Sequence, residues 1–436
     1  MTDSSSNVSN TLTVTSFTID STAPTVSSVA AVSSNGSYIT SGITISINVV
    51  FSETLTVSTI GGTPTLTLNM GATNKNASYV SGSGSTTLVF SYTLQQGDTS
   101  SDLDYTTTSA LATNGGTISD SAGNSATLTL ASPGATGSLG SNSALVIALP
   151  YIYIVDTSNH RLVRIDDMSG TGWTSLGSFG SGTHQFNQPT MMFVDTSRNI
   201  YIGDKLNHRL VKMNDMAGTG WTTFGSSGSG TNQFNQPWGI FVRSNGQIFV
   251  GDLNNNRIVR MDDISGTNWT SYGTLGTGTG QFDLPIGVHI NASGYFYVTQ
   301  YNTGRISFSQ DFSSTGWTTL GTAGAGTNQF TQTYGITQDS SGRIYIVDSG
   351  NHRIVRIDDM SGTNWTTYGT GPGTGTGQFN HPNGISIDTA GRIYVSEYDN
   401  HRIVRFDDMS GTNWITYGSS GSGTGQFTNA QDIFVR

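Results

Sequence analysis

The sequence predicts an all-β protein, in which a β-sandwich precedes a six-bladed β-propeller closed by the C-terminal strand. The first observation is a period of 48 to 49 residues in the C-terminal two-thirds of the chain. The second is a set of four strand-like segments within each period. The third is that residues 1–150, outside the period, show short alternating strands and no helical periodicity. The period is marked by Trp173, Trp221, Trp269, Trp317, Trp365 and Trp414.

These observations divide the chain into three predicted parts. Residues 1–20 are expected to form a lead-in strand or the tail of a preceding repeat, residues 21–148 the β-sandwich, and residues 149–436 the propeller. The N-terminal 150 residues hold seven carboxylates and one lysine, a net charge of −6. The remaining residues therefore carry −4 of the total −10, together with all seven histidines and all seven tryptophans.

Composition excludes several classes of function. No basic excess is present to bind nucleic acid non-specifically. The absence of cysteine excludes disulfides, thiolate zinc sites and cysteine nucleophiles. No apolar run approaches the roughly 20 residues that span a bilayer, and residues 1–10 have no signal-peptide pattern. We therefore expect an extracellular or cell-surface protein whose export signal lies outside this chain, within a longer tandem-domain parent.

The first region alternates β-branched or aromatic residues with polar ones in segments 11–19, 43–51, 64–70 and 86–94. Segments rich in glycine, asparagine and serine separate these strands and supply residues for turns with positive φ. Short strands at this spacing are typical of a β-sandwich.

The order of these segments resembles a bacterial immunoglobulin-like repeat that occurs in tandem in large surface and adhesion proteins. The resemblance covers most of residues 21–147. It is carried by STAPTVSSV (21–29), VVFSETLTV (49–57), GTPTLTLN (62–69), residues 77–105, GGTISDSAGNSATLTL (115–130) and GATGSLGSNSALVI (134–147). It implies that the first domain is a spacer in a bacterial cell-surface adhesin.

Five carboxylates of the first region are candidate calcium ligands, because calcium prefers clustered carboxylate and carbonyl oxygens. The alternative is that aspartate and asparagine shape turns here, as in SDSAGN (119–124). The five candidates are Asp20, Glu53, Asp102, Asp104 and Asp120.

Each period of the second region reads as four antiparallel strands. In the unit from Gln378 they are GISID (384–388), RIYVSEY (392–398), HRIVRFD (401–407) and NWITYG (413–418). The first unit, from Tyr151, lacks an innermost strand, and residues 425–436 supply a spare copy of one. A closed ring is therefore favoured over an open solenoid.

The repeated unit resembles the NHL repeat, named for its Asn-His-Leu-type motif. The resemblance is carried by NHR at 159–161, 207–209, 351–353 and 400–402 and by strands such as IYIVD (344–348). It covers residues 151–436. The unit at 285–320 departs, because Gln300 replaces the acid at the strand end and Thr303-Gly304 replaces Asn-His.

Some relatives in this fold group, the peptidylglycine amidating lyases and calcium-dependent lactonases, are enzymes that hold metals in the central tunnel. Here only His289 offers an imidazole on an inner strand, and one histidine does not make a zinc site. We therefore expect a non-enzymatic protein. The alternative is a secreted metal-dependent lyase or lactonase that uses His289 with Asp195, Asp339 and Asp388.

The ligand site is expected where the copies differ from one another. The loop into each inner strand and the loop after each second strand should open on one face. At the first place the copies read Thr190, Trp238, Ile286, Tyr334, Asn383 and Gln431, and at the second Thr157, Lys205, Leu253, Tyr301, Ser349 and Tyr398.

Six of these residues are the predicted ligand-binding set. Large aromatics beside polar groups suit a sugar ring or a protein partner, and Lys205 is the only positive charge in the two series. The alternative is that the rings plug the channel or pack between blades. We expect an adhesion protein whose propeller binds a glycan or a protein. The set is Trp238, Tyr301, Tyr334, Tyr398, Lys205 and Asn383.

Overall fold

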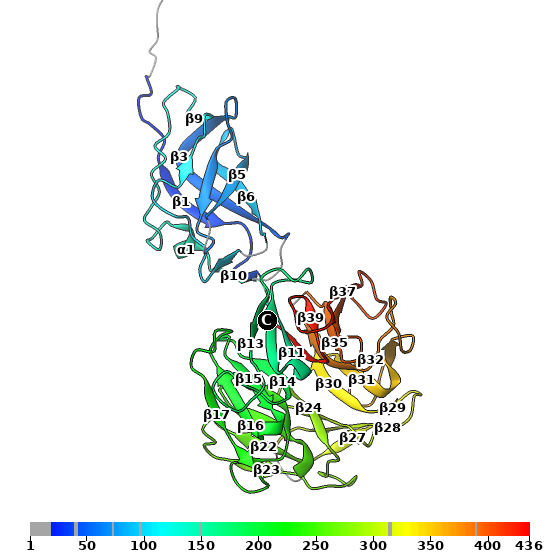
Figure 1. The fold of residues 1–436 in the computed structure, drawn as a ribbon. Helices are drawn as coiled ribbons and strands as arrows, with labels where there is room; N and C mark the ends of the chain where they lie inside the picture. The colour runs from blue at the N-terminus through cyan, green and yellow to red at the C-terminus, as the bar shows by residue number, and fades with distance from the viewer. Residues whose placement is uncertain are drawn as a thin grey trace, which may run out of the picture. The chain divides into compact units, whose positions relative to one another are not determined.

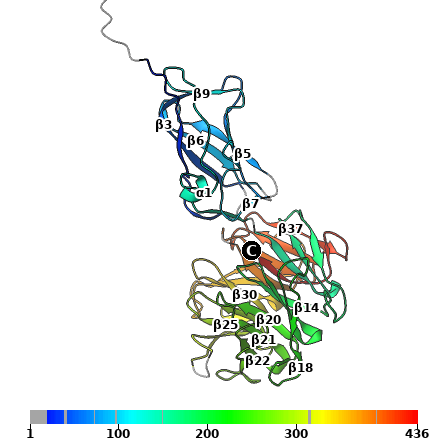
Figure 2. The ribbon, with the colours of Figure 1, turned by 90° about the vertical axis from the view of Figure 1, so that its left-hand side faces the viewer.

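The computed structural model describes residues 19–38, 42–71, 74–95, 98–148, 150–312, 316–388 and 390–436. The predicted lead-in segment 1–20 therefore lies almost wholly outside the described residues. The chain divides into two compact units, Met1–Leu149 and Pro150–Arg436, and strands dominate both (Figures 1 and 2). Among the described residues, no helix has the length and apolar character needed to cross a membrane.

The first unit is built from one large and one small sheet. The large sheet has the order β1-β3-β6-β5-β4-β8, with β9 paired to the end of β3, and the small one has the order β2-β10-β7. A short helix, α1 (Leu139–Asn142), is capped by the Ser138 hydroxyl. The strands are β1 (Val26–Ala31), β2 (Gly36–Tyr38), β3 (Thr44–Ser58), β4 (Thr65–Leu68), β5 (Lys75–Ser81), β6 (Ser85–Thr93), β7 (Thr99–Ser100), β8 (Leu111–Ala112), β9 (Thr117–Ser119) and β10 (Leu145–Ala148).

The core of this unit follows from the alternation in its sequence. Along Ile45–Phe51 of β3 and Leu88–Tyr92 of β6 every second residue is buried, as the two-residue period of a half-buried strand requires. Phe90 and Tyr105 are among the largest fully buried side chains. The Tyr105 hydroxyl keeps its hydrogen bond by donating to the Ala131 carbonyl oxygen at 2.8 Å.

The second unit is a six-bladed propeller, as predicted. Each blade is a four-stranded antiparallel sheet that runs from an inner strand to an outer strand. The inner strands are β40 (Ala430–Val435), β14 (Pro189–Val194), β20 (Pro237–Val242), β24 (Pro285–Ile290), β30 (Thr333–Gln338) and β34 (Pro382–Ile387) for blades 1 to 6. The second strands are β11 (Ile152–Asp156), β15 (Ile200–Asp204), β21 (Ile248–Asp252), β25 (Phe296–Gln300), β31 (Ile344–Asp348) and β35 (Ile393–Glu397).

The third and outer strands complete the blades. The third strands are β12 (Arg161–Ile165), β16 (Arg209–Met213), β22 (Arg257–Met261), β26 (Arg305–Ser309), β32 (Arg353–Ile357) and β36 (Arg402–Phe406). The outer strands are β13 (Thr174–Leu176), β17 (Thr222–Phe224), β23 (Thr270–Tyr272), β27 (Thr318–Leu320), β33 (Thr366–Tyr368) and β37 (Ile415–Tyr417). Short parallel pairs in the connecting loops are β18 (Ser226–Ser227) with β19 (Gln233–Phe234), β28 (Thr322–Ala323) with β29 (Gln329–Phe330), and β38 (Ser419–Ser420) with β39 (Gln426–Phe427).

The C-terminal strand closes the ring. β40 pairs antiparallel with β11, and Ile152 lies opposite Val435. The backbone amides of Tyr151 and Arg436 each donate to the other residue's carbonyl oxygen, at 2.7 and 3.0 Å. Each inner strand contacts the inner strands of both neighbouring blades, so the six inner strands form a closed ring.

The period of the tryptophans follows from packing between blades. Each tryptophan packs against the phenylalanine of the glycine-rich loop that precedes its blade, and ring centroids lie 5.1 to 5.5 Å apart. An aromatic pair of this kind adds about 1 kcal/mol to the burial of its surface. The pairs are Trp173–Phe427, Trp221–Phe186, Trp269–Phe234, Trp317–Phe282, Trp365–Phe330 and Trp414–Phe379.

The Asn-His-Arg motif joins each blade to both neighbours, as the structure of blade 5 illustrates. Arg353 Nε donates to the buried Asp348 carboxylate at 2.7 Å, and Asn351 Nδ2 donates to the same oxygen at 2.8 Å. The other guanidinium nitrogens donate to carbonyls of the loop before the blade. His352 has φ 54° and accepts the backbone amide of His381 at 3.2 Å through Nδ1. These contacts give the motif a structural role.

Blade 4 keeps the fold without the buried ion pair. Gln300 Oε1 accepts the Asp283 amide at 2.9 Å, and its Nε2 donates to the Ser307 hydroxyl at 2.6 Å. Arg305 still donates to loop carbonyls, but its Nε has no partner among the described residues. Burial lowers the pKa of Arg305. An amide therefore replaces the carboxylate geometrically, but it leaves one buried donor unsatisfied.

Candidate functional site

The six residues of the predicted ligand set meet in one pocket of about 460 Å³. Trp238, Tyr334 and Asn383 come from the second positions of inner strands β20, β30 and β34. The other three residues follow the ends of the second strands of blades 2, 4 and 6. The remaining lining residues are Gln332, Ser349, His381, Asp399 and Gln431.

Strand register explains the convergence. The first residue of each inner strand lies opposite the last residue of the second strand, as in Pro237 with Asp252 and Pro382 with Glu397. A shift in register follows each of these pairs before regular pairing resumes. The residues directly after both positions therefore share one rim of the channel. In five of six blades the buried carboxylate and its arginine fix this rim.

One side of the pocket is aromatic. Tyr334 lies between Trp238 and Tyr301, with centroid distances of 6.2 and 5.5 Å. Behind them lie Met191, Leu253 and Ile286. Trp238 is only 8% exposed, whereas Tyr301 and Tyr334 are half-buried. Trp238 thus also packs between blades, as the alternative hypothesis predicts, and the two tyrosines offer the larger free faces.

Lys205 lies against this aromatic side, with its Nζ 4.7 Å from the centre of the Trp238 ring. Burial lowers the pKa of the Lys205 ammonium. Burial, with the neighbouring Tyr301, Tyr398 and Asp399, raises the pKa of Tyr334. At neutral pH Tyr334 is therefore a neutral hydroxyl in the same pocket as the half-buried Lys205.

The opposite side of the pocket is polar. Asn383 Oδ1 accepts the Ser349 hydroxyl at 3.2 Å, and His381 Nδ1 lies 2.6 Å from Asp399 Oδ2. Gln431, in blade 1 next to the blade that holds Lys205, is 2% exposed, and its Nε2 has no hydrogen-bond partner among the described residues. On the aromatic side, the Trp238 Nε1 also has no partner among those residues.

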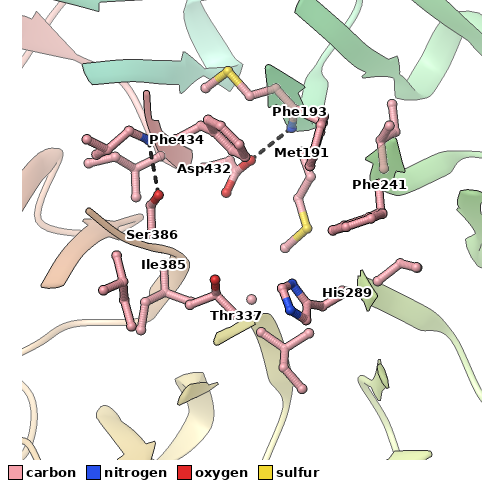
Figure 3. Close-up of a pocket in the computed structure, with 18 of the residues that line it drawn as sticks. Met191, Phe193, Phe241, His289, Thr337, Ile385, Ser386, Asp432 and Phe434 are labelled. Carbon is pink, nitrogen blue, oxygen red and sulfur yellow. Dashed lines mark hydrogen bonds between the residues drawn. The ribbon is translucent and has the colours of Figure 1, made fainter. Parts of the chain in front are cut away.

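A second cavity, of about 240 Å³, lies in the central tunnel (Figure 3). Three rings, Phe434, Phe193 and Phe241, form a continuous wall with centroid distances of 5.2 and 5.0 Å. His289 continues it, 5.4 Å from Phe241, and burial lowers the pKa of His289 to about 4. Asp432 accepts the Met192 amide at 2.8 Å, and burial raises the pKa of Asp432 to about 7.

The predicted tunnel set of the enzyme alternative is wrong in its carboxylates. Asp195, Asp339 and Asp388 do not line the cavity that holds His289. Each ends an inner strand, and its carboxylate accepts backbone amides of the following hairpin and a tyrosine hydroxyl. The sequence pattern of an acid after an inner strand is therefore a turn signal here.

The five calcium candidates fall into two groups. Oxygen atoms of Asp20, Glu53 and Asp120 lie within 4.8 Å of one another. Burial, followed by repulsion from Asp20 and Asp120, raises the pKa of Glu53. Asp102 and Asp104 lie elsewhere, beside the backbone of Gly140. Asp120 also accepts both the backbone amide and the side-chain amide of Asn124, which supports the turn-forming alternative for that residue.

Comparison with known proteins supports the propeller assignment. The NHL repeat pattern matches residues 234–261, 335–357 and 379–406, in blades 3, 5 and 6. The second unit is thus a six-bladed β-propeller with NHL repeats. No curated protein sequence matches the chain significantly.

Solved structures resemble this chain at low sequence identity. A chain of the "Nidogen/Laminin Complex" is 16% identical with a TM-score of 0.51, and the match covers 66% of this chain and 98% of that one. The "Streptogramin B lyase structure" is 17% identical with a TM-score of 0.45, covering 65% and 83%. A catalytically inactive virginiamycin B lyase from Staphylococcus aureus with quinupristin is 16% identical with a TM-score of 0.43, covering 62% and 83%.

Sequence reasoning missed four residues of the two cavities. Gln431 belongs to the compared series but carries no aromatic or charged group to single it out. His381 lies two residues before the compared position Asn383, and Asp399 lies one residue after the compared position Tyr398. Asp432 had a usable signal, because its equivalents in four other blades are glycine. An added Cβ at Gly384 would lie 2.4 Å from Asp432 Oδ1, so the glycine leaves room for that carboxyl.

Proposed function

We propose that this protein is a non-enzymatic adhesion protein whose propeller binds a carbohydrate in the pocket around Trp238 and Tyr334. The observation that carries the proposal is the convergence of all six variable residues on one open pocket. Two half-buried tyrosine faces beside amide and hydroxyl groups suit the apolar faces and hydroxyls of a sugar ring. A protein hot spot with the same chemistry is the alternative ligand.

The N-terminal unit fits the role of a spacer. Its strand content and buried core are compatible with the bacterial immunoglobulin-like repeat that its sequence resembles. We accordingly place the protein outside a bacterial cell, at its surface or released from it, as part of a longer tandem-domain protein. Tethering of a binding domain on a spacer raises its effective concentration at a target surface.

The proposal includes calcium at Asp20, Glu53 and Asp120. A bound divalent cation would relieve the mutual repulsion of these carboxylates. Calcium should then raise the thermal midpoint of unfolding of the N-terminal unit, and Glu53→Gln should abolish the increase. Asp102→Asn, outside the cluster, is the matched control. An unchanged midpoint in wild-type protein at millimolar calcium would remove calcium from the proposal.

The binding proposal is tested on an array of neutral and acidic glycans with purified full-length chain. The Trp238→Ala/Tyr334→Ala variant should lose selective binding. Tyr295→Ala provides the control, because this half-buried tyrosine follows β24 at the end away from the pocket. Circular dichroism confirms that each variant is folded.

The outcomes separate the hypotheses. Selective binding that only the pocket variant loses would support a lectin-like function. Binding that survives in the pocket variant would move the site elsewhere. No binding to any glycan would contradict the carbohydrate ligand and favour the protein partner.

A further inference from the structure

The pocket contains a cation that lacks an anionic partner. Among the described residues, Lys205 forms no ion pair with any carboxylate, although in five blades an arginine is paired with the buried acid at the end of the second strand. The Trp238 ring attracts the ammonium through its π-face, but it offers no lone pair to the three N–H donors. A partly buried ammonium gains most from a charged acceptor.

Two further side chains that line the same pocket each carry a buried donor without a partner among the described residues. The Trp238 Nε1 and Gln431 Nε2 atoms have no hydrogen-bond partner among residues of the described ranges, and both side chains are more than nine-tenths buried. An unpaired buried donor is costly, so a ligand that supplies acceptors is favoured. Gln431, Lys205 and Trp238 belong to the consecutive blades 1, 2 and 3. The excess of donors is therefore local to one side.

The other side does not satisfy these donors. Asp399 is the carboxylate of the pocket, and it is bonded to His381 in blade 6. The Asn383 carbonyl oxygen already accepts the Ser349 hydroxyl. These two acceptors are thus engaged away from Lys205.

We propose that the pocket recognises a sugar carrying a carboxylate group, and that Lys205 is the residue that selects it. This inference rests on the proposed carbohydrate-binding function. The carboxylate accepts from Lys205 and from the neighbouring amide or indole donors, while the sugar ring lies against the tyrosine faces. One lysine matches one carboxylate, whereas sulfated or phosphorylated polymers require several cations, and the propeller's net charge of −4 disfavours them.

The test compares matched sugars on the full-length chain. Titration calorimetry would measure the affinity of wild-type protein, Lys205→Gln and Lys212→Gln for three oligosaccharides. These end in glucuronic acid, in sialic acid and in glucose. Lys212 on β16 is the control, because it lies in the same blade beside Tyr201 and does not line the pocket. Lys205→Arg retains the charge and tests whether charge itself is required.

We expect wild-type protein and Lys212→Gln to bind an acidic sugar about tenfold more tightly than the glucose-terminated one. Lys205→Gln should abolish this preference, Lys205→Arg should retain much of it, and added salt should weaken it. Equal affinity for acidic and neutral sugars would overturn this inference while leaving the proposed function intact. Absence of all sugar binding would contradict both.

Discussion

Five blades of the propeller hold a buried carboxylate against an arginine, whereas blade 4 holds Gln300 against the same arginine position. Both arrangements build the same four-stranded sheet. Asp432 presents the converse case, a buried carboxyl without an arginine partner in the described structure. The comparison teaches that the repeat geometry needs a hydrogen-bond acceptor at the end of the second strand. A negative charge on that acceptor adds stability, but blade 4 folds without it.

The largest expected effect follows from removing the buried carboxylate at the end of one second strand. Asp348→Ala removes the acceptor of Arg353, Asn351 and the Thr331 amide together. Because this leaves a guanidinium unpaired in a mostly buried site, the free energy of unfolding should fall by about 3–5 kcal/mol. Denaturant unfolding measures it. Gln300→Ala, at the equivalent position without charge, should cost less, and an equal loss would show that the ion pair is irrelevant.

Asp432 tests a buried carboxyl without an arginine. Its folded pKa of about 7 lies above the unfolded value of 3.8, so the folded state binds the extra proton between these values. Stability should therefore fall as pH rises from 4 to 7, by about 4 kcal/mol at most from this group.

Asp432→Asn should remove this component of the pH dependence, and the difference between variant and wild type isolates it. Other charged groups near β40 are His289 and Arg436 in the cavity, the paired Asp156 and Glu397 on β11 and β35, and Arg402 and Arg405 on β36. Parallel pH curves for the two proteins would contradict a raised pKa for Asp432.

Blades 4 and 6 hold an uncharged and a charged side chain, Gln300 and Glu397, at the equivalent position, and each can be replaced by the other type. Gln300→Glu gives the unpartnered Arg305 Nε an acceptor, and should raise the free energy of unfolding by about 1–2 kcal/mol. Glu397→Gln makes the reverse change beside Arg402 and should lower it by a similar or larger amount. If both variants shift the free energy of unfolding in the same direction, this would contradict the interpretation that a carboxylate at this position adds stability.

The smallest effect concerns the histidine of the motif. His208 Nδ1 accepts the Gln236 amide at 3.2 Å, and Asn256 Oδ1 fulfils the same role in blade 3 at 3.1 Å. His208→Ala should lower the free energy of unfolding by about 1–2 kcal/mol, whereas His208→Asn should be nearly neutral. Thermal unfolding distinguishes them, and equal losses would assign the role to ring packing instead.

The propeller was predictable because one pattern occurs six times and each copy tests the others. The position of the pocket was predictable for the same reason, since residues such as Trp238 and Lys205 differ from the residues at the equivalent positions of the other copies. Asp432 was not, because its pKa depends on burial among neighbouring inner strands that no linear spacing reveals. The metal-ligand role expected for the acids after the inner strands was wrong for a related reason, because turn-forming and metal-binding aspartates cannot be distinguished in sequence.

The hydrogen bonds between Tyr151 and Arg436 have a mechanical consequence. The polypeptide enters and leaves the propeller through neighbouring strands of one blade, so tension applied at both points would load the β11–β40 ladder directly. The other five blades lie outside that path and would bear force only after this ladder separates. Separation of this ladder would withdraw Gln431 together with β40 and would open the proposed binding pocket.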